Sequence, residues 1–252
     1  MGRKEQARRV TRQAKQSTKQ GQVIDFPEQS FDESLPQIKR DNTPIEPRNS
    51  SQLDYQRALE TKQLIFATGE AGCGKTFLAA AYAAERLLAK DFDRIIVTRP
   101  VLSADEDLGF LPGDMSEKFA PYFRPVYDVL QKRLGGNYLR YCLKPGIDKV
   151  EIAPFAYMRG RNFENAVVIL DEAQNTTAQQ MKLFLTRIGE NCLVIVNGDV
   201  TQCDLPHHVK SGLGDALSRF EVDDLVGLIR FTKEDCVRSL LCQRTLYAYG
   251  EE

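Results

Sequence analysis

From Gln52 onward, short runs of apolar and β-branched residues alternate with longer segments in which apolar residues recur at helical spacing. This alternation is typical of crossover units, in which helices connect parallel strands. Several short runs are apolar throughout, as expected for strands buried on both faces of a sheet. The predicted strands are residues 63–68, 94–98, 150–153, 166–170, 192–197 and 225–230.

The longer segments predict helices over residues 51–60, 75–89, 116–134, 178–188, 209–220 and 233–248. The apolar residues of the fourth helix would form one core-facing stripe. Thr232 and Asp235 resemble a capping box with Asp in place of the usual Glu, which predicts the start of the last helix. The pattern as a whole predicts an α/β domain with a parallel sheet and helices on both faces.

The chain before this pattern differs in charge and composition. Residues 1–20 carry seven basic side chains and one acidic one, a local charge of +6, so the net charge of −1 leaves −7 on the remaining residues. Residues 21–50 show little apolar periodicity and contain four of the eleven prolines, which favours an extended linker. We therefore predict a basic tail and flexible linker over residues 1–50 and one folded domain over residues 51–252. The tail is either a solvated extension or a contact for nucleic acid.

Composition excludes several classes of protein. The longest apolar run, residues 77–84, is far shorter than the roughly 18–20 residues of a membrane-spanning helix. The first residues contain no apolar segment typical of a secretory signal, so we expect a cytoplasmic protein without a membrane partner. Six scattered cysteines, none in a C-x-x-C pair, and two histidines predict neither a zinc site nor a disulfide framework. We expect reduced thiols.

The strongest motif is GEAGCGKT at residues 69–76, which matches G-x-x-x-x-G-K-[ST] between a predicted strand and a predicted helix. Glycines allow successive backbone N–H groups to surround phosphate oxygens, and the helix presents its positive end to the same anion. We expect Lys75 to reach the β- and γ-phosphates and the Thr76 hydroxyl to ligate Mg²⁺. Cys73 is interpreted as a small filler residue. The expected ATP-binding residues here are Gly69, Glu70, Ala71, Gly72, Cys73, Gly74, Lys75, Thr76 and Phe77.

Two further segments place polar side chains after predicted strands. Asp171 and Glu172 follow the apolar run 167–170, so both lie at the carboxyl end of a buried strand. We assign Asp171 to the Mg²⁺ shell and Glu172 to the general base that polarises the attacking water. Gln202, in the segment NGDVTQ at residues 197–202, is a candidate catalytic amide that would hydrogen-bond the γ-phosphate or that water.

The base of the nucleotide is harder to predict. The sequence lacks the N-K-x-D motif that would indicate recognition of guanine. Gln52 and Tyr55 lie on the helix before the first strand, where an amide can read adenine and an aromatic ring can stack on it. A surface glutamine and a packed tyrosine explain the same residues equally well.

Five segments together resemble the PhoH family: GEAGCGKT, TRPVLSADEDLGFLPGD (98–114), DEAQN (171–175), NGDVTQCDLP (197–206) and KEDCVRSLLCQRTL (233–246). The resemblance covers the chain from Gln52 to its last residue. It implies an ATP-binding, RecA-like P-loop core related to the first motor domain of superfamily-one helicases, with a link to RNA metabolism. It also places Gln52 at an adenine-reading position, and Asp171, Glu172 and Gln202 at helicase-like motif positions.

One RecA-like domain is half of a helicase motor, which affects the expected assembly. An arginine supplied across the nucleotide accelerates phosphoryl transfer by about 10³ to 10⁵ where it has been measured. We therefore predict a homo-oligomeric ring, such as a hexamer, with the nucleotide between subunits. Arg238 is the first candidate for this arginine and Arg244 the second, although both also fit surface positions on a helix.

Other basic residues compete for a role in RNA binding. Arg99 follows the second strand, and Arg159 and Arg161 precede the Asp171 strand. Each fits a phosphate contact, a subunit interface or an ion pair equally well. Three nearby aromatic residues could stack on bases: Phe155, Tyr157 and Phe163. We favour core positions for them, because the alternating spacing of Phe155 and Tyr157 suits one face of a strand.

The leading interpretation is an ATPase that acts on RNA or on an RNA-bound partner. The alternative is a nucleotide-dependent switch that controls assembly with little turnover. A small-molecule kinase is disfavoured because DEAQ and GDVTQ suit activation of water.

Overall fold

The computed structural model describes residues 38–100, 115–158 and 160–236, together with residues 241, 244, 245, 248 and 249, and for residues 115–120 it gives the helix without the side chains. A six-stranded sheet with the order β3-β2-β4-β5-β1-β6 forms the centre, and every neighbouring pair is parallel. The strands are β1 (Leu64–Thr68), β2 (Arg94–Arg99), β3 (Val150–Pro154), β4 (Ala166–Leu170), β5 (Cys192–Gly198) and β6 (Val226–Arg230).

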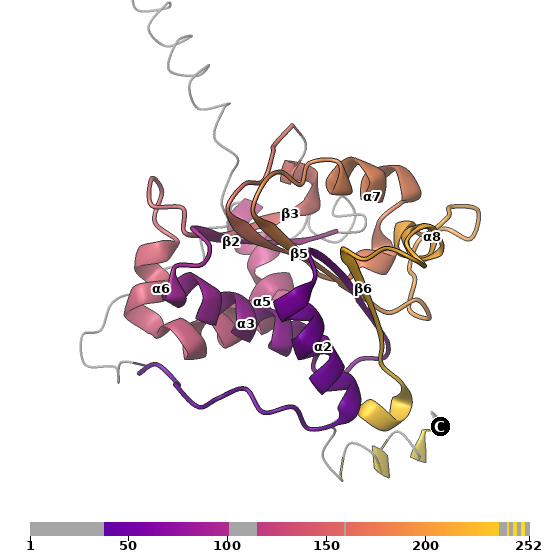
Figure 1. The fold of residues 1–252 in the computed structure, drawn as a ribbon, viewed down its shortest axis with the longest axis horizontal. Coiled ribbons are helices and arrows are strands. Elements are labelled where there is room, and N and C mark those ends of the chain that lie inside the picture. Colours follow the sequence, from indigo (N-terminus) through magenta and orange to yellow (C-terminus); the bar gives the residue numbers. More distant parts are fainter. Residues whose placement is uncertain are drawn as a thin grey trace, which may run out of the picture.

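Helices cover both faces of this sheet (Figure 1). On one face lie α2 (Ser50–Thr61), α3 (Lys75–Ala89), α5 (Met115–Leu134) and α6 (Gly136–Cys142). On the other lie α7 (Ala178–Leu185) and α8 (Gly212–Arg219). Short 3₁₀ turns complete the described elements: η1 (Phe155–Met158), η2 (Ala173–Asn175) and η3 (Lys233–Asp235).

Two apolar cores follow from this layering. Alternate residues of each strand point to opposite faces, so Ile65 joins the core under α3 while Phe66 joins the core under α7 and α8. Helix α3 buries a run of alanines that includes Ala79, Ala80 and Ala83. Small side chains allow the helix to lie close to the sheet, which brings its first turn near the ends of the strands.

The predicted α/β class and all six predicted strands are confirmed, with strand ends that differ by at most one residue. Helix α6 was not predicted, and α8 begins at Gly212, three residues later than expected. The predicted capping box at Thr232 and Asp235 is present, but it opens only the turn η3, and Cys236 then returns to extended backbone. The prediction of one continuous helix from residue 233 is therefore wrong at its start.

Residues 38–49, predicted as linker, run along α5 and α2. The Asp41 N–H donates to the Lys132 carbonyl at 2.8 Å, and the Arg133 guanidinium donates to the Thr43 carbonyl at 2.6 Å. The packed domain therefore begins before residue 51. The rest of the predicted tail, residues 1–37, lies outside the described residues, as do residues 101–114 of the second family motif. Among the helices that are described, none has the length and apolar character needed to cross a membrane.

Candidate nucleotide-binding site

The parallel sheet brings several of the predicted functional segments to one edge. Strand β5 lies between β1 and β4, so the loop after β1 and the acidic residues after β4 flank the end of β5. Strand β2 pairs with β4 on the other side and ends at Arg99. The carboxyl ends of parallel strands form the edge at which ligands bind in open α/β sheets.

Backbone geometry gives the loop after β1 the shape expected of a phosphate-binding loop. Gly69, Gly72 and Gly74 have φ values of 141°, 93° and 88°, which L side chains rarely adopt. A Cβ atom at Gly69 would lie 2.5 Å from the Phe231 carbonyl oxygen. Gly74 caps α3 without any side-chain acceptor, so no side chain of the cap occupies the helix N–H groups there. These groups and the helix dipole favour an anion at this position.

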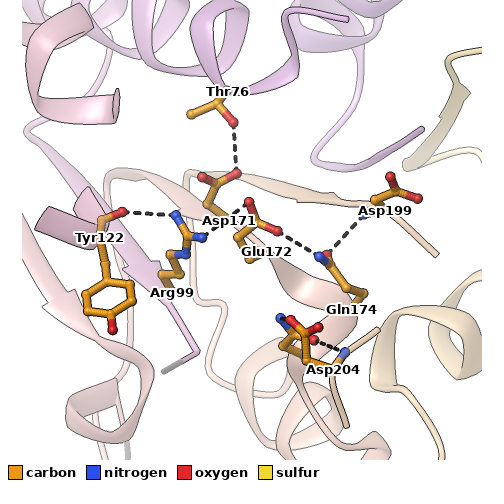
Figure 2. Close-up of polar contacts among 9 residues, drawn as sticks. Thr76, Arg99, Tyr122, Asp171, Glu172, Gln174, Asp199 and Asp204 are labelled. Carbon is orange, nitrogen blue, oxygen red and sulfur yellow. Dashed lines mark hydrogen bonds and ion pairs between the residues drawn. The ribbon is translucent and has the colours of Figure 1, made fainter. Parts of the chain in front are cut away.

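The first two residues of α3 connect the loop to the acidic strand. Lys75 Nζ donates to the carbonyl oxygens of Gly69 at 2.6 Å and Glu70 at 2.8 Å. Thr76 Oγ1 donates to Asp171 Oδ1 at 3.0 Å (Figure 2). The structure thus brings Lys75, Thr76 and Asp171 together as the sequence predicted.

The two carboxylates differ in environment. Burial, and then the charge of Glu172, raises the pKa of Asp171, while the hydrogen bond from Thr76 acts in the opposite direction. Asp171 is therefore a buried acid whose ionised form gains from a nearby cation. Glu172 has a φ of 53°, the left-handed conformation that is rare for residues other than glycine. Such backbone persists where the surrounding contacts hold it.

Those contacts come from Arg99 and Gln174 (Figure 2). The Arg99 guanidinium forms an ion pair with Glu172 at 3.4 Å and also donates to the Tyr122 carbonyl at 3.0 Å. Gln174 Nε2 donates to the other Glu172 oxygen at 2.7 Å. Gln174 Oε1 accepts the Asp199 N–H at 3.0 Å, so this buried amide joins Glu172 to the end of β5.

A glycine makes room for that amide. A Cβ atom at Gly198 would lie 2.8 Å from Gln174 Oε1 and 2.5 Å from Leu213 Cδ2. No role was predicted for Gln174, although it lies in the DEAQN segment, or for Asn197. A polar residue at the end of the otherwise apolar run of β5 was the signal for Asn197.

Three buried polar atoms near this edge have no hydrogen-bond partner among the described residues: Thr98 Oγ1, Asn197 Nδ2 and Asp199 Oδ2. All three belong to the carboxyl ends of β2 and β5 or directly follow them. Buried polar atoms are normally paired, so unpaired ones at a strand edge indicate that water or a ligand completes them.

The prediction that Tyr55 stacks on adenine is wrong, and the packed alternative holds. Its ring is fully buried, in edge-to-face contact with Phe231, and its hydroxyl donates to Asn197 Oδ1 at 2.9 Å. Burial raises its pKa well above the usual range for tyrosine. Gln52 is also buried, and its Nε2 donates to the Cys73 carbonyl at 3.0 Å, so the Gln52 side chain supports the loop after β1. Its contact with adenine stays a prediction.

The remaining candidates are exposed or lie outside the described residues. Gln202 is exposed in the turn after β5, with its N–H bonded to the Asp199 carbonyl at 3.2 Å. Phe77 is 48% exposed on the first turn of α3. Arg244 is exposed, and Arg238 lies outside the described residues. The catalytic roles of Gln202 and Arg238 stay predictions.

The basic and aromatic residues before β4 are mostly structural. The Arg161 guanidinium pairs with both carboxylate oxygens of Glu151, which is the ion-pair alternative. Phe155 and Phe163 are buried in the core under α7, which is the core alternative. Arg159 lies outside the described residues.

A family profile described as PhoH-like protein matches residues 44–250. The chain belongs to the PhoH family. It is 74% identical over 211 residues to the Protein PhoH of Escherichia coli strain K12, an alignment that covers 84% of this chain and 60% of that protein. It is 42% identical over 229 residues to a PhoH-like protein of Bacillus subtilis strain 168, covering 91% of this chain and 71% of the relative. The chain thus spans about 60% of the length of the E. coli relative.

Comparison with solved structures gives low scores. The UvsW helicase of bacteriophage T4 has a TM-score of 0.42 at 12% identity, covering 89% of this chain and 76% of that one. The Pif1 helicase of Candida albicans has a TM-score of 0.34 at 14% identity, covering 75% and 41%. Neither likeness bears on function. Family membership, the strand order and the loop after β1 identify the domain as a P-loop NTPase-like protein with a RecA-like fold.

Proposed function

We propose that the chain binds ATP with Mg²⁺ and hydrolyses it. The observation that carries this proposal is the 3.0 Å hydrogen bond between Thr76 Oγ1 and Asp171 Oδ1. It joins the phosphate loop of β1 to the acidic end of β4, which is the juxtaposition that nucleotide phosphates and their metal ion require.

The residues present fit a magnesium ion. Mg²⁺ prefers oxygen ligands and keeps several of its waters, so one hydroxyl and one carboxylate suffice as direct protein ligands. Thr76 and Asp171 supply that pair, and the unpaired Asp199 Oδ2 is a buried acceptor at the same sheet edge. When bound, Mg²⁺ would neutralise charge on the β- and γ-phosphates.

The other side chains have separable tasks. Lys75 would exchange its bonds to the loop carbonyls for phosphate oxygens, because an ammonium group prefers an anion to a neutral acceptor. Glu172 would accept a proton from the attacking water. Gln174 would hold the Glu172 carboxylate in place, and its second hydrogen bond to Asp199 would connect that carboxylate to the turn that carries Gln202.

One observation favours the alternative, a nucleotide-dependent switch with little turnover. Both carboxylate oxygens of Glu172 already have partners, Arg99 on one and Gln174 on the other. A cation beside the carboxylate competes with water for its oxygen. Fast hydrolysis would therefore require Arg99 to move away from Glu172.

The proposal includes RNA as the partner and a homo-oligomer as the assembly. Arg99 lies at the sheet edge with its side chain 25% exposed, so RNA phosphates could draw it from Glu172 and couple binding to turnover. A ring such as a hexamer would place an arginine of a neighbouring subunit at the nucleotide, with Arg238 and then Arg244 as candidates.

Steady-state phosphate release, measured with and without RNA, tests this proposal. The native chain should release phosphate faster with RNA, and Glu172→Gln should release little under either condition while still binding ATP. If both proteins are equally slow under every condition, the switch is the better description.

A further inference from the structure

The phosphate loop contains a cysteine whose sulfur meets a second cysteine from a distant part of the chain. Cys73 Sγ and Cys236 Sγ are 2.7 Å apart, although the two residues are 163 positions apart in the sequence. The bond in a disulfide is about 2.05 Å long, so a shift of about 0.7 Å would bring the sulfurs to bonding distance. Both residues are free thiols in the structure.

The surroundings keep the two sulfurs together. Cys236 follows η3, where the capping box of Thr232 and Asp235 fixes the backbone. The Cys236 thiol lies 3.5 Å from the Ala71 carbonyl, and the Cys73 thiol lies 3.7 Å from the Thr232 carbonyl. Each sulfur therefore contacts the segment that carries the other, and the contact follows from the packing of η3 against the loop.

We propose that Cys73 and Cys236 form a thiol oxidation site, in which a hydroperoxide converts the pair to a disulfide that locks the phosphate loop. The bond itself depends only on the sulfur geometry. Its consequence for nucleotide binding rests on the proposed function.

The accessibility of the two thiols sets the order of the steps. Cys73 is fully buried and Cys236 is partly exposed. Burial, followed by the neighbouring Cys236 sulfur, raises the pKa of Cys73 to about 12, so Cys73 is a neutral thiol near pH 7. A hydroperoxide would therefore react first at Cys236.

The chemistry balances with one molecule of hydrogen peroxide as the hydroperoxide. The Cys236 sulfur attacks a peroxide oxygen, the O–O bond breaks, and a sulfenic acid and one water form. The Cys73 sulfur then attacks the Cys236 sulfur, the S–S bond forms and the S–O bond breaks. The departing hydroxide takes the Cys73 proton as a second water. Two thiols lose two electrons, and hydrogen peroxide is reduced to two waters.

The loop has little freedom once this bond exists. Cys73 lies between Gly72 and Gly74, whose left-handed backbone shapes the cradle, and its carbonyl already accepts from Gln52. Lys75 must leave the carbonyls of Gly69 and Glu70 to reach phosphates. A second covalent anchor at Cys73 opposes that rearrangement, so oxidation should weaken nucleotide binding.

The test uses the full chain, hydrogen peroxide and a fluorescent ATP analogue with Mg²⁺. After oxidation, free thiols are alkylated and peptides are mapped by mass spectrometry without reduction. We expect a peptide that links residues 73 and 236, nucleotide affinity at least fivefold weaker, and recovery of both after dithiothreitol. Cys236→Ser should bind nucleotide normally and resist peroxide. Cys203→Ser removes an exposed cysteine whose thiol contacts the Gln174 carbonyl rather than the phosphate loop, and this variant should remain sensitive to peroxide.

Two results would overturn the proposal. One is the absence of the linked peptide when Cys203 is already oxidised, which would show that the pair is less reactive than an ordinary exposed thiol. The other is a linked peptide with unchanged nucleotide affinity, which would show that the bond does not lock the loop. A reduced native chain that binds no nucleotide would instead refute the proposed function, and the mapped peptide would still decide whether the pair is an oxidation site.

Discussion

Replacing Gln174 by leucine should slow hydrolysis without preventing nucleotide binding. The substitution removes the 2.7 Å hydrogen bond to the Glu172 carboxylate and leaves the Asp199 N–H without its acceptor. Hydrogen bonds to charged groups contribute about 1.5–3 kcal/mol. If that energy orients Glu172 for the reaction, turnover should fall by about 10- to 100-fold, because each 1.36 kcal/mol is tenfold in rate. Neither lost bond involves the loop or Lys75, so ATP affinity should change little.

The assay compares saturated ATP turnover with equilibrium binding of a non-hydrolysable ATP analogue. Gly198→Ala provides an independent route to the same defect, because its methyl group would lie 2.8 Å from Gln174 Oε1 and displace the amide. Gln179→Leu, on the exposed side of α7, is the matched control and should leave both quantities unchanged. Thermal denaturation of each variant separates a loss of folding from a loss of positioning.

Full turnover by a folded Gln174→Leu protein would show that this amide does not position the base. A loss of analogue binding equal to the loss of turnover would also refute the reasoning, since it would place Gln174 in nucleotide binding rather than in the chemical step.

Three further predictions follow from the site and the tail. Burial raises the pKa of Asp171 in the folded state, so the folded chain loses stability as pH rises and this buried carboxyl ionises. Asp171→Asn should therefore raise the melting temperature at pH 7, by an amount that shrinks as pH falls towards 4. The same variant should lose Mg²⁺-dependent nucleotide binding. Arg99→Ala should remove the stimulation of phosphate release by RNA. Arg124→Ala, which removes an exposed arginine paired with Asp128, should keep that stimulation. Equal stimulation in both variants would exclude Arg99 as the residue that couples RNA binding to turnover. Deleting residues 1–37 should weaken RNA binding in a salt-dependent manner and spare ATP binding, and a titration in which only ATP binding weakened would contradict the assignment of the tail.

Local signals in the sequence sufficed for the strands and the phosphate loop. The central strands β1, β4 and β5 are apolar runs buried on both faces, and the loop glycines are required by positive φ values, so both features can be recognised from neighbouring residues in the sequence. Asp171 could be placed beside Thr76 for the same reason, since parallel strands deliver their carboxyl ends to one edge.

Contacts between distant segments were not predictable in this way. Whether Tyr55 stacks on a base or packs in the core depends on Asn197 and Phe231, which are far from it in sequence. The hydrogen bonds that connect Glu172, Gln174 and Asp199 likewise depend on the packing of β4 beside β5. The helix expected from residue 233 failed at its start because the capping box serves a single turn that leads Cys236 back to the phosphate loop.

The most direct test of ATP hydrolysis by this site is a single-turnover measurement, in which the chain is in excess over ATP and both Mg²⁺ and RNA are present. The native chain should convert its bound ATP to ADP. Glu172→Gln should bind the same amount of ATP and convert it slower by about 10²- to 10⁴-fold, the usual contribution of a general base. Equal rates for the two proteins, or ATP that stays intact on the native chain, would contradict the claim that Glu172 hydrolyses ATP held by the phosphate loop.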